Sequence, residues 1–333
     1  MLSMFTQPGR RSAVAKLIGL SALTVLSALS HSGAQADTPV KFMVPFPAGG
    51  AADSMARILV EKLKDELNQT IVVENRPGAS TRVAAEVLKQ AQPDGNTVLM
   101  TLLDTMVIAP MVYSNLRYNV AKDFAPITEV ATVTYALAVN ASEPYQNLND
   151  YLKAAKSNSG KATLGTTGLG STLHFLAYEF ANQSKVDMTI VPFQGGPLMV
   201  TNLIGNQIGS AVDGLGVFLE QHKSGKLRIL AVSGGKRASQ LPKVPTLAES
   251  GFPSLTSGSS YALYAPAGTP EAQIQRWNKA MRKVLALPEV RERILGIGYE
   301  PLPGSSPAEV TQLQQKMSEH WKPIVKASNY KGD

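Results

Sequence analysis

Short apolar runs alternate with longer stretches in which apolar residues recur every three or four positions. The short runs predict β-strands and the periodic stretches predict α-helices, so the chain has the βα alternation of an α/β fold with mostly parallel sheets. The predicted strands are 40–46, 71–74, 97–101, 135–139, 162–165, 189–193, 208–212, 227–232 and 261–265. The predicted helices are 54–67, 81–90, 148–157, 172–184, 197–204, 216–224, 271–286, 288–296 and 307–327.

A chain of 333 residues favours two domains, and two similar strand pieces suggest where they divide. Tyr135-Ala136-Leu137 and Tyr261-Ala262-Leu263 both read as strands that cross between domains. This interpretation predicts one lobe from residues 37–138 plus 261–333 and a second lobe from residues 139–260. Ligands of open α/β sheets bind at the carboxyl ends of the strands, where the cleft between two such lobes would lie.

The N-terminus has the pattern of a secretory signal. Basic residues at Arg10, Arg11 and Lys16 precede a short apolar run and the small-residue site Ala34-Gln35-Ala36. We therefore expect residues 1–36 to be a signal peptide, cleaved after Ala36, and the mature protein to be periplasmic. An uncleaved membrane anchor is the alternative, and the Arg10-Arg11 pair leaves export by the Sec or the twin-arginine route open.

Composition excludes several classes of site. There is no cysteine, which rules out thiol nucleophiles, zinc-thiolate sites and disulfides. Removing residues 1–36 takes away three of the 32 basic residues and none of the 25 acidic ones, which leaves a dispersed net charge of +4. That balance does not predict nucleic-acid binding. The mature chain has only His174, His222 and His320, far apart in sequence, and we expect no metal and no cofactor.

The first predicted strand runs into a glycine turn and then a helix. The turn is Pro47-Ala48-Gly49-Gly50, and Ala51, Ala52 and Asp53 open the helix. Backbone N–H groups at a helix start have no intrahelical partner, and together with the helix dipole they favour an anion. This loop therefore predicts a cradle for a small acid, with the Asp53 carboxylate organising the loop instead of contacting the anion.

A similar loop recurs in the second predicted lobe. Thr166-Thr167-Gly168-Leu169-Gly170-Ser171-Thr172 joins a strand to a helix, as does Phe193-Gln194-Gly195-Gly196-Pro197. Each loop alone is typical of an ordinary βα turn. Two such loops across a cleft, in an exported protein, favour binding of a dicarboxylate or of a carboxylate with a polar tail. Asp213 ends a strand, where it is equally suited to entering the cleft or to capping the next helix.

Asp104 and Thr105 follow the strand at 97–101. Asp104 is a good N-cap for a helix that begins at Thr105, which is the favoured interpretation. The alternative places the Asp104 side chain in the cleft, paired with a cationic ligand group such as an ammonium.

Catalytic motifs are weak. The chain has no G-x-S-x-G elbow and no Walker loop, and the glycine loop at 168–173 lacks the last glycine of a dinucleotide fingerprint. Ser171 and His174 are spaced to meet on one helical face, so a secreted hydrolase is the one enzymatic alternative. We expect no enzymatic activity and no catalytic residue.

Glycine- and proline-containing motifs occur in order along the mature chain, at residues 45–57, 73–79, 93–95, 170–174, 192–197, 225–228 and 265–270. The first reads PFPAGGAADSMAR. Together they resemble the Bug-type extracytoplasmic receptors of tripartite tricarboxylate transporters. The resemblance implies a two-lobed type II periplasmic binding-protein fold, a "Venus flytrap" that closes on a small carboxylate and delivers it to membrane permease subunits.

The resemblance also implies ligand-binding residues. The loop from Ala48 to Asp53 would hold one carboxylate, and the segments 166–172 and 193–197 would hold the distal end together with Asp213. The residues that we expect to bind ligand are Ala48, Gly49, Gly50, Ala51, Ala52, Asp53, Asp104, Thr105, Thr167, Gly168, Ser171, Thr172, Phe193, Gly195, Gly196 and Asp213.

Near the expected cleft this chain departs from the family pattern, with Leu102-Leu103-Asp104-Thr105-Met106 in place of small polar residues and a histidine. It also has Ser259-Ser260-Tyr261 where many members have a tryptophan. These changes bear on the ligand and not on the fold. We expect a monomeric transport receptor, and a carrier that presents its ligand to a signalling receptor is the alternative.

Overall fold

The computed structural model describes residues 1–2, 39–256 and 258–332, and the chain from Pro39 onward forms one compact unit. The predicted signal peptide and its cleavage site lie outside the described residues, apart from Met1 and Leu2. Within the described ranges no helix is both long enough and apolar enough to span a membrane.

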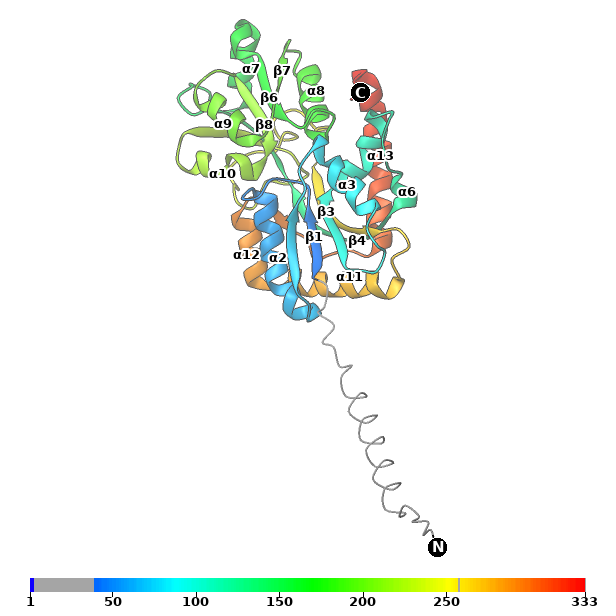
Figure 1. Cartoon of the computed structure of the whole chain (residues 1–333). Helices are drawn as coiled ribbons and strands as arrows, with labels where there is room; N and C mark the ends of the chain where they lie inside the picture. Colours follow the sequence, from blue (N-terminus) through cyan, green and yellow to red (C-terminus); the bar gives the residue numbers. More distant parts are fainter. Residues whose placement is uncertain (3–38, 257, 333) are drawn as a thin grey trace. The chain divides into compact units, whose positions relative to one another are not determined.

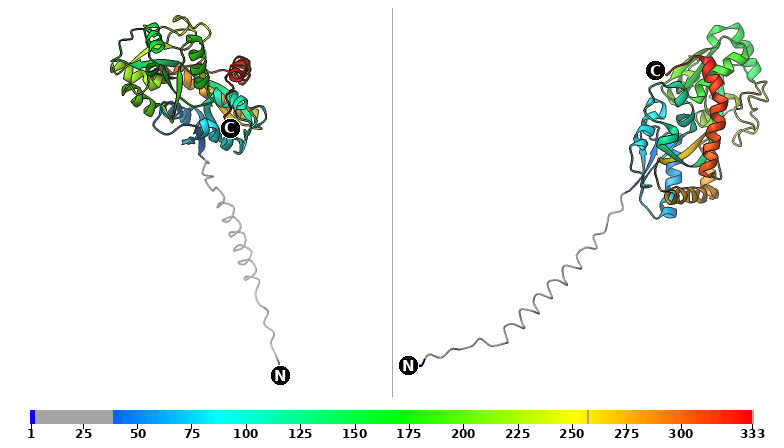
Figure 2. Two further views of the ribbon diagram at one scale, coloured as in Figure 1. Left: turned by 90° about the horizontal axis from the view of Figure 1, so that it is seen from above. Right: turned by 90° about the vertical axis from the view of Figure 1, so that its right-hand side faces the viewer.

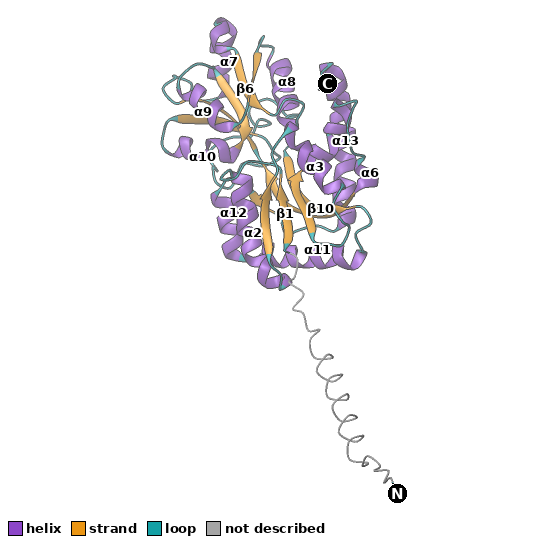
Figure 3. Cartoon of the chain, in the orientation of Figure 1, coloured by secondary structure: helices purple, strands orange, loops and turns teal. Residues whose placement is uncertain are grey.

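Two separate sheets, each flanked by helices, make up the unit (Figures 1 and 3). The sheet of lobe 1 has the strand order β11-β4-β10-β3-β1-β2, and the sheet of lobe 2 has the order β7-β6-β8-β5-β9. The strands of lobe 1 are β1 (Val40–Val44), β2 (Ile71–Asn75), β3 (Thr97–Leu102), β4 (Phe124–Val133), β10 (Ser259–Pro266) and β11 (Glu300–Pro301). The strands of lobe 2 are β5 (Tyr135–Asn140), β6 (Thr163–Thr167), β7 (Thr189–Phe193), β8 (Ser210–Gly214) and β9 (Leu227–Val232).

The helices pack on both sheets, which confirms the predicted two-lobed α/β fold. Lobe 1 carries α2 (Ala51–Leu67), η1 (Ala79–Thr81), α3 (Arg82–Lys89), α4 (Leu103–Val107), α5 (Ala109–Val112), α6 (Val120–Asp123), α11 (Glu271–Ala286), α12 (Pro288–Gly296) and α13 (Pro307–Ser328). Lobe 2 carries α7 (Leu148–Ser157), η2 (Ser159–Lys161), α8 (Thr172–Ser184), α9 (Gly196–Ile204) and α10 (Leu215–Lys223). The predicted bounds of α7, α8, α11 and α12 agree with the structure at both ends.

The expectation of mostly parallel sheets was wrong. Strand β10 runs antiparallel to both β3 and β4, and β5 runs antiparallel to both β8 and β9. The sequence analysis also missed β4, because Pro126 and Glu129 interrupt its apolar pattern. Both residues nevertheless pair with β10, opposite Tyr264 and Ala262, in a ladder that contains two register shifts. Among the strands of the described residues, β1 pairs in parallel with β2 and β3, and β6 pairs in parallel with β7 and β8.

The C-terminal helix contacts both lobes. Helix α13 packs along β4, and its last turns meet α8 of lobe 2 (Figure 2). Trp321 and Val325 share an apolar cluster with Phe175 of α8, and the Tyr178 hydroxyl donates to the Ala327 carbonyl at 3.2 Å. Beyond the helix, the Gly332 N–H donates to the Val112 carbonyl at 3.1 Å. The chain therefore has a link between the lobes in addition to the crossover segments.

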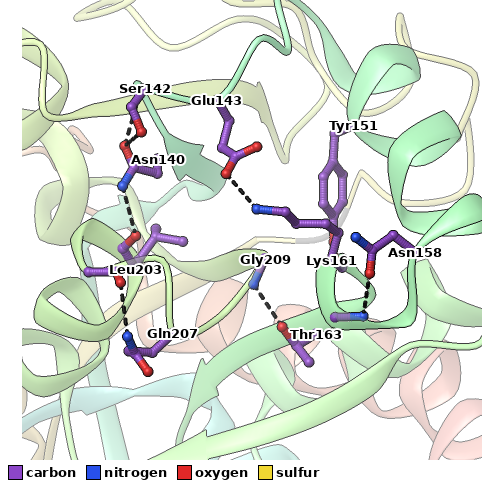
Figure 4. A network of polar contacts seen from close by, with 12 residues as sticks. Asn140, Ser142, Glu143, Tyr151, Asn158, Lys161, Thr163, Leu203, Gln207 and Gly209 are labelled. Atoms are coloured by element: carbon purple, nitrogen blue, oxygen red, sulfur yellow. Dashed lines mark hydrogen bonds and ion pairs between the residues drawn. The ribbon is translucent and has the colours of Figure 1, made fainter.

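A polar network fixes the end of the lobe 2 sheet at which β6 and β8 begin (Figure 4). Lys161 forms an ion pair with Glu143 at 2.5 Å, and the Gly209 N–H donates to Thr163 Oγ1 at 2.7 Å. A side chain at position 209 would lie 2.1 Å from the Lys161 carbonyl oxygen, so only glycine fits there. This network holds the amino ends of β6 and β8 in place. Their carboxyl ends lie at the opposite end of the sheet.

Trp277 on α11 anchors the core of lobe 1. The side chain is 1% exposed, its ring centroid lies 6.4 Å from that of Phe42 on β1, and its indole N–H donates to the Gly95 carbonyl at 2.9 Å. Trp277→Ala should lower the free energy of unfolding by about 3–5 kcal/mol, because it removes a large buried ring and leaves that carbonyl unpaired. Urea unfolding measures the change. Lys279→Ala on the exposed side of the same helix is the control, and an equal loss in both variants would contradict this role.

Candidate functional site

The loop between β1 and α2 is held in shape by Asp53. Its Oδ2 accepts hydrogen bonds from the Gly49 N–H and from Arg57 Nε, both at 2.9 Å, and its Oδ1 accepts one from Asn75 Nδ2 at 3.0 Å. The same Asn75 amide donates to the Phe46 carbonyl at 3.0 Å. The hydrogen bond from Arg57 is the main reason that the pKa of Asp53 lies below its ordinary range. Asp53 therefore organises the loop, in the role that we predicted for it.

Helix α2 begins without a side-chain cap. Gly50 is its N-cap and provides no side-chain cap, and the residues Pro47 to Gly50 are exposed. Gly49 adopts a left-handed φ of 81°, which lets the chain turn sharply into the helix. The N–H groups of Ala51 and Ala52 lie in the first turn, where an α-helix offers no internal acceptor. The loop thus has the predicted strand–turn–helix shape, and its role as an anion cradle stays a prediction.

The loop between β6 and α8 has a comparable shape in lobe 2. Gly168 and Gly170 take left-handed φ values of 67° and 74°, and Ser171 is the N-cap of α8 without a side-chain capping bond. Ser171 Oγ and Thr172 Oγ1 are buried and have no hydrogen-bond partner. A side chain at Gly170 would lie 3.1 Å from Val112 and Tyr330, so this loop is closely packed against lobe 1 and the C-terminal tail.

Asp104 does not cap the helix that follows it, which corrects the favoured prediction. The N-cap of α4 is Leu102, and Asp104 lies inside the first turn. Its Oδ2 accepts a hydrogen bond from the backbone N–H of Thr172 at 3.2 Å, and its Oδ1 accepts one from Ser259 Oγ at 2.8 Å. A carboxylate of lobe 1 is therefore bound to the N-terminus of α8 in lobe 2. Burial raises the pKa of Asp104.

Thr105 points away from this contact. Its hydroxyl pairs with Thr101 Oγ1 at 2.8 Å and with Thr81 Oγ1 at 2.5 Å, and its carbonyl accepts from the Tyr118 hydroxyl at 2.6 Å. Because these partners all belong to lobe 1 and Thr105 is 1% exposed, its side chain stabilises the lobe instead of facing the other lobe.

Asp213 closes the end of β8. Its Oδ2 accepts from Thr167 Oγ1 at 2.8 Å and its Oδ1 accepts from the Gly214 N–H at 2.7 Å. Gly214 is the N-cap of α10, which has no side-chain cap, so Asp213 does not cap that helix in the usual way. Burial raises the pKa of Asp213 to about 6.

Aromatic side chains also belong to this region. The sequence pattern did not predict them as site residues. The ring centroids of Phe46 and Tyr261 lie 6.2 Å apart, and those of Tyr261 and Tyr299 lie 5.4 Å apart. The Tyr135 hydroxyl is buried without a hydrogen-bond partner. Burial and the nearby charge of Asp104 raise the pKa of Tyr135, and Asp213 adds to this effect. The repeated crossover strands were the one sequence signal that pointed to Tyr135 and Tyr261.

The third predicted loop makes its contacts within lobe 2. Phe193 ends β7, the edge strand, and its ring would lie 3.2 Å from a side chain at Gly165. Gly195 has a φ of 124° and is the N-cap of α9, while a side chain at Gly196 would lie 2.8 Å from Val217. These glycines allow α9 to pack closely, and a ligand role for Phe193, Gly195 and Gly196 stays a prediction.

Ser171 and His174 do not form a nucleophile–base pair. His174 Nδ1 accepts from the Gly170 N–H at 3.3 Å, and its ring lies 4.6 Å from that of Tyr330. Ser171 Oγ has no hydrogen-bond partner. The hydrolase alternative therefore lacks the contact on which its chemistry depends.

A cavity lies beside Ser259, a hydrogen-bond partner of Asp104. This cavity of about 270 Å³ is bordered by the crossover segments 132–134, 233–235 and 258–260 and by Leu313 and Met317 of α13. Ser259 borders this cavity and also bonds to Asp104.

Across residues 39–256 and 258–332, no three His, Asp or Glu side chains are grouped so that they could hold a metal ion.

Residues 55–330 match the family model described as "Tripartite tricarboxylate transporter family receptor". The chain belongs to this family. Its members are periplasmic solute-binding proteins, so the resemblance found in the motifs is confirmed.

Individual relatives agree with this membership along nearly the whole receptor. A UPF0065 protein of Bordetella bronchiseptica is 32% identical over 311 residues, which is 92% of each chain. The periplasmic binding protein BugD is 30% identical with a TM-score of 0.76, covering 86% of this chain and 97% of BugD. An R. palustris protein, solved with adipate, is 28% identical with a TM-score of 0.81, covering 88% of this chain and 97% of that one.

The raised pKa of Asp213 predicts how the stability of the receptor depends on pH. The folded-state pKa of about 6 exceeds the ordinary value of 3.8, so the folded state holds this proton more tightly than the unfolded state. The free energy of unfolding should therefore fall as pH rises from 3.8 to 6, by roughly 3 kcal/mol for this group. Asp213→Asn should remove that fall. The free energy of unfolding of the variant minus that of wild type, measured by urea unfolding, should therefore be more positive at pH 7.5 than at pH 4.5. An equal difference at the two pH values would contradict the assignment.

Proposed function

We propose that the receptor captures a small organic acid between its lobes, with the ligand carboxylate bound by the β1–α2 loop. The main support is the exposed loop before α2, where no side chain caps the helix and Asp53 fixes the turn through Gly49 and Arg57. A carboxylate there gains from both the N–H groups and the helix dipole. The family membership and the adipate in a 28% identical relative also support an acidic ligand.

Lobe closure is the proposed mechanism. Two lobes joined by crossover segments can rotate about them, and a ligand that contacts both lobes stabilises the closed state. The closed receptor would then dock on membrane permease subunits and release the acid, without converting it chemically. We propose a monomer in the periplasm, with the signal peptide removed after Ala36. The lobe boundaries, residues 37–138 plus 261–333 and residues 139–260, stay a prediction, whereas the strand pairing groups residues 135–138 with lobe 2 and residues 259–260 with lobe 1.

Thermal unfolding of the purified mature chain in the presence of acids tests ligand capture. The panel holds monocarboxylates, amino acids, aromatic acids, dicarboxylates and tricarboxylates. An acid at 100 times its dissociation constant should stabilise the fold by about 2.7 kcal/mol. If no acid on the panel changes the melting temperature, the proposed function fails.

Ala51→Pro tests the cradle itself. Ala51 is the first residue of α2, where proline suits the helix but removes one backbone donor. Gly50 before it has φ −77° and ψ 170°, which is compatible with a following proline. Any acid found in the panel should bind this variant about tenfold to a hundredfold more weakly in calorimetry, at nearly unchanged stability.

Glu271→Pro is the matched control for this substitution, because Glu271 is the first residue of α11 and belongs to a helix outside the loop. It should bind the same acid as wild type does. Equal affinity for wild type and Ala51→Pro would place the carboxylate elsewhere.

A further inference from the structure

We propose that the receptor selects acids with a single carboxylate whose other end carries a hydrogen-bond donor, best an ammonium group, and that Asp104 imposes this choice. The inference rests on the proposed function and specifies the class of ligand that the same site accepts.

Asp104 already fills the anion position of lobe 2. The start of α8 is the counterpart of the cradle at α2, and the second carboxylate of a dicarboxylate would be expected there. In this structure the Thr172 N–H at that position donates to Asp104 Oδ2 at 3.2 Å, and Ser259 holds the other oxygen at 2.8 Å. A second ligand carboxylate would have to displace Asp104 or lie beside its charge.

Asp213 adds a second buried carboxylate without a cation. Asp104 and Asp213 are each 7% exposed. Asp104 accepts hydrogen bonds from Thr172 and Ser259, and Asp213 accepts them from Thr167 and Gly214. In the described part of the chain neither carboxylate has an ion-pair partner. Asp213 lies on β8 next to the strand that carries Tyr135, and both carboxylates are near enough to raise the pKa of the Tyr135 hydroxyl. Two unpaired buried carboxylates favour a cation and oppose a further anion.

Three hydroxyls at the same place have no partner. Tyr135 is 2% exposed and Thr172 is 0% exposed, yet the Tyr135 hydroxyl, Thr172 Oγ1 and Ser171 Oγ make no hydrogen bond of normal geometry. The nearest polar neighbours of the Tyr135 hydroxyl are Ser259 and Thr172, and Thr172 lies beside Asp104. An unmet buried hydroxyl is costly, so such groups are commonly satisfied by a bound molecule. Around Asp104 and Asp213 they can accept from or donate to a polar end group, which suits an amine better than an aliphatic tail.

The site therefore divides into two unlike halves. The β1–α2 loop offers N–H donors and receives the ligand carboxylate. The opposite half offers carboxylate oxygens and hydroxyls and receives a donor. A ligand with one carboxylate and one ammonium group matches both halves, whereas a dicarboxylate of the same length matches only the first.

Calorimetry with matched acids tests this selection on the full mature chain. The probes are 4-aminobutyrate against succinate and 6-aminohexanoate against adipate, together with the α-amino acids and the unsubstituted monocarboxylates of the thermal panel. Wild type should bind the best amino acid at least about tenfold more tightly than any dicarboxylate. Asp104→Asn keeps an acceptor for the Thr172 N–H but lacks the charge, and it should narrow this ratio about tenfold or reverse it.

Asp187→Asn is the matched control, because Asp187 is an exposed carboxylate of lobe 2 and its substitution makes the same change in charge. It should leave the ratio unchanged. Tyr135→Phe provides a second test that does not alter charge: it should raise the melting temperature of the ligand-free receptor and weaken the amino acid by about threefold or more. Unchanged binding by Tyr135→Phe would overturn the geometry.

The outcomes distinguish failure of this inference from failure of the proposed function. A wild-type receptor that binds a dicarboxylate as tightly as any amino acid, with the same ratio in Asp104→Asn, overturns the inference and leaves the proposed function standing. Binding of no acid by wild type or Asp104→Asn overturns both.

Discussion

Thr134 alone separates the last residue of β4 from the first residue of β5, so one residue connects the two sheets on the outward path of the chain. This short connection is held on both sides: the Leu215 N–H donates to the Thr134 carbonyl at 2.8 Å, and Ser233 Oγ accepts from the Tyr135 N–H at 2.9 Å. Because the link is one residue long, the last residue of β4 in one sheet lies next to the first residue of β5 in the other. The loops at the carboxyl ends of β1, β3, β6 and β8 face this junction for the same reason.

Buried carboxylates at the junction have two different roles. Asp53 is paired with Arg57 and accepts further bonds from Gly49 and Asn75, so its charge is neutralised within its own loop. Among residues 39–256 and 258–332, the hydrogen-bond donors to Asp104 and Asp213 are all neutral groups. A buried charge without a counter-charge lowers stability, and its persistence is typical of a functional site. The contrast separates the scaffold of the site from the groups that would recognise a ligand.

The sequence predicted the parts of the structure that local chemistry decides. Glycine turns, helix starts and apolar periodicity gave the strands and helices on either side of both cradles, and the role of Asp53 followed from its place in a first turn. Contacts between residues far apart in the sequence could not be predicted from local patterns. Strand β4 is hidden by Pro126 and Glu129, which its partner β10 accommodates through register shifts. The partner of Asp104, Thr172, lies 68 residues away, and only the folded chain shows that these residues meet.

The tail after α13 has a practical consequence for handling the protein. Tyr330 packs against His174, and Gly332 lies on the ring of Tyr113, next to Gly170 and the start of α8. Tyr330 and Gly332 are therefore packed at the contact between lobe 1 and the start of α8. An affinity tag fused there would lie beside the contact between α8 and lobe 1 and would shift the balance between open and closed forms.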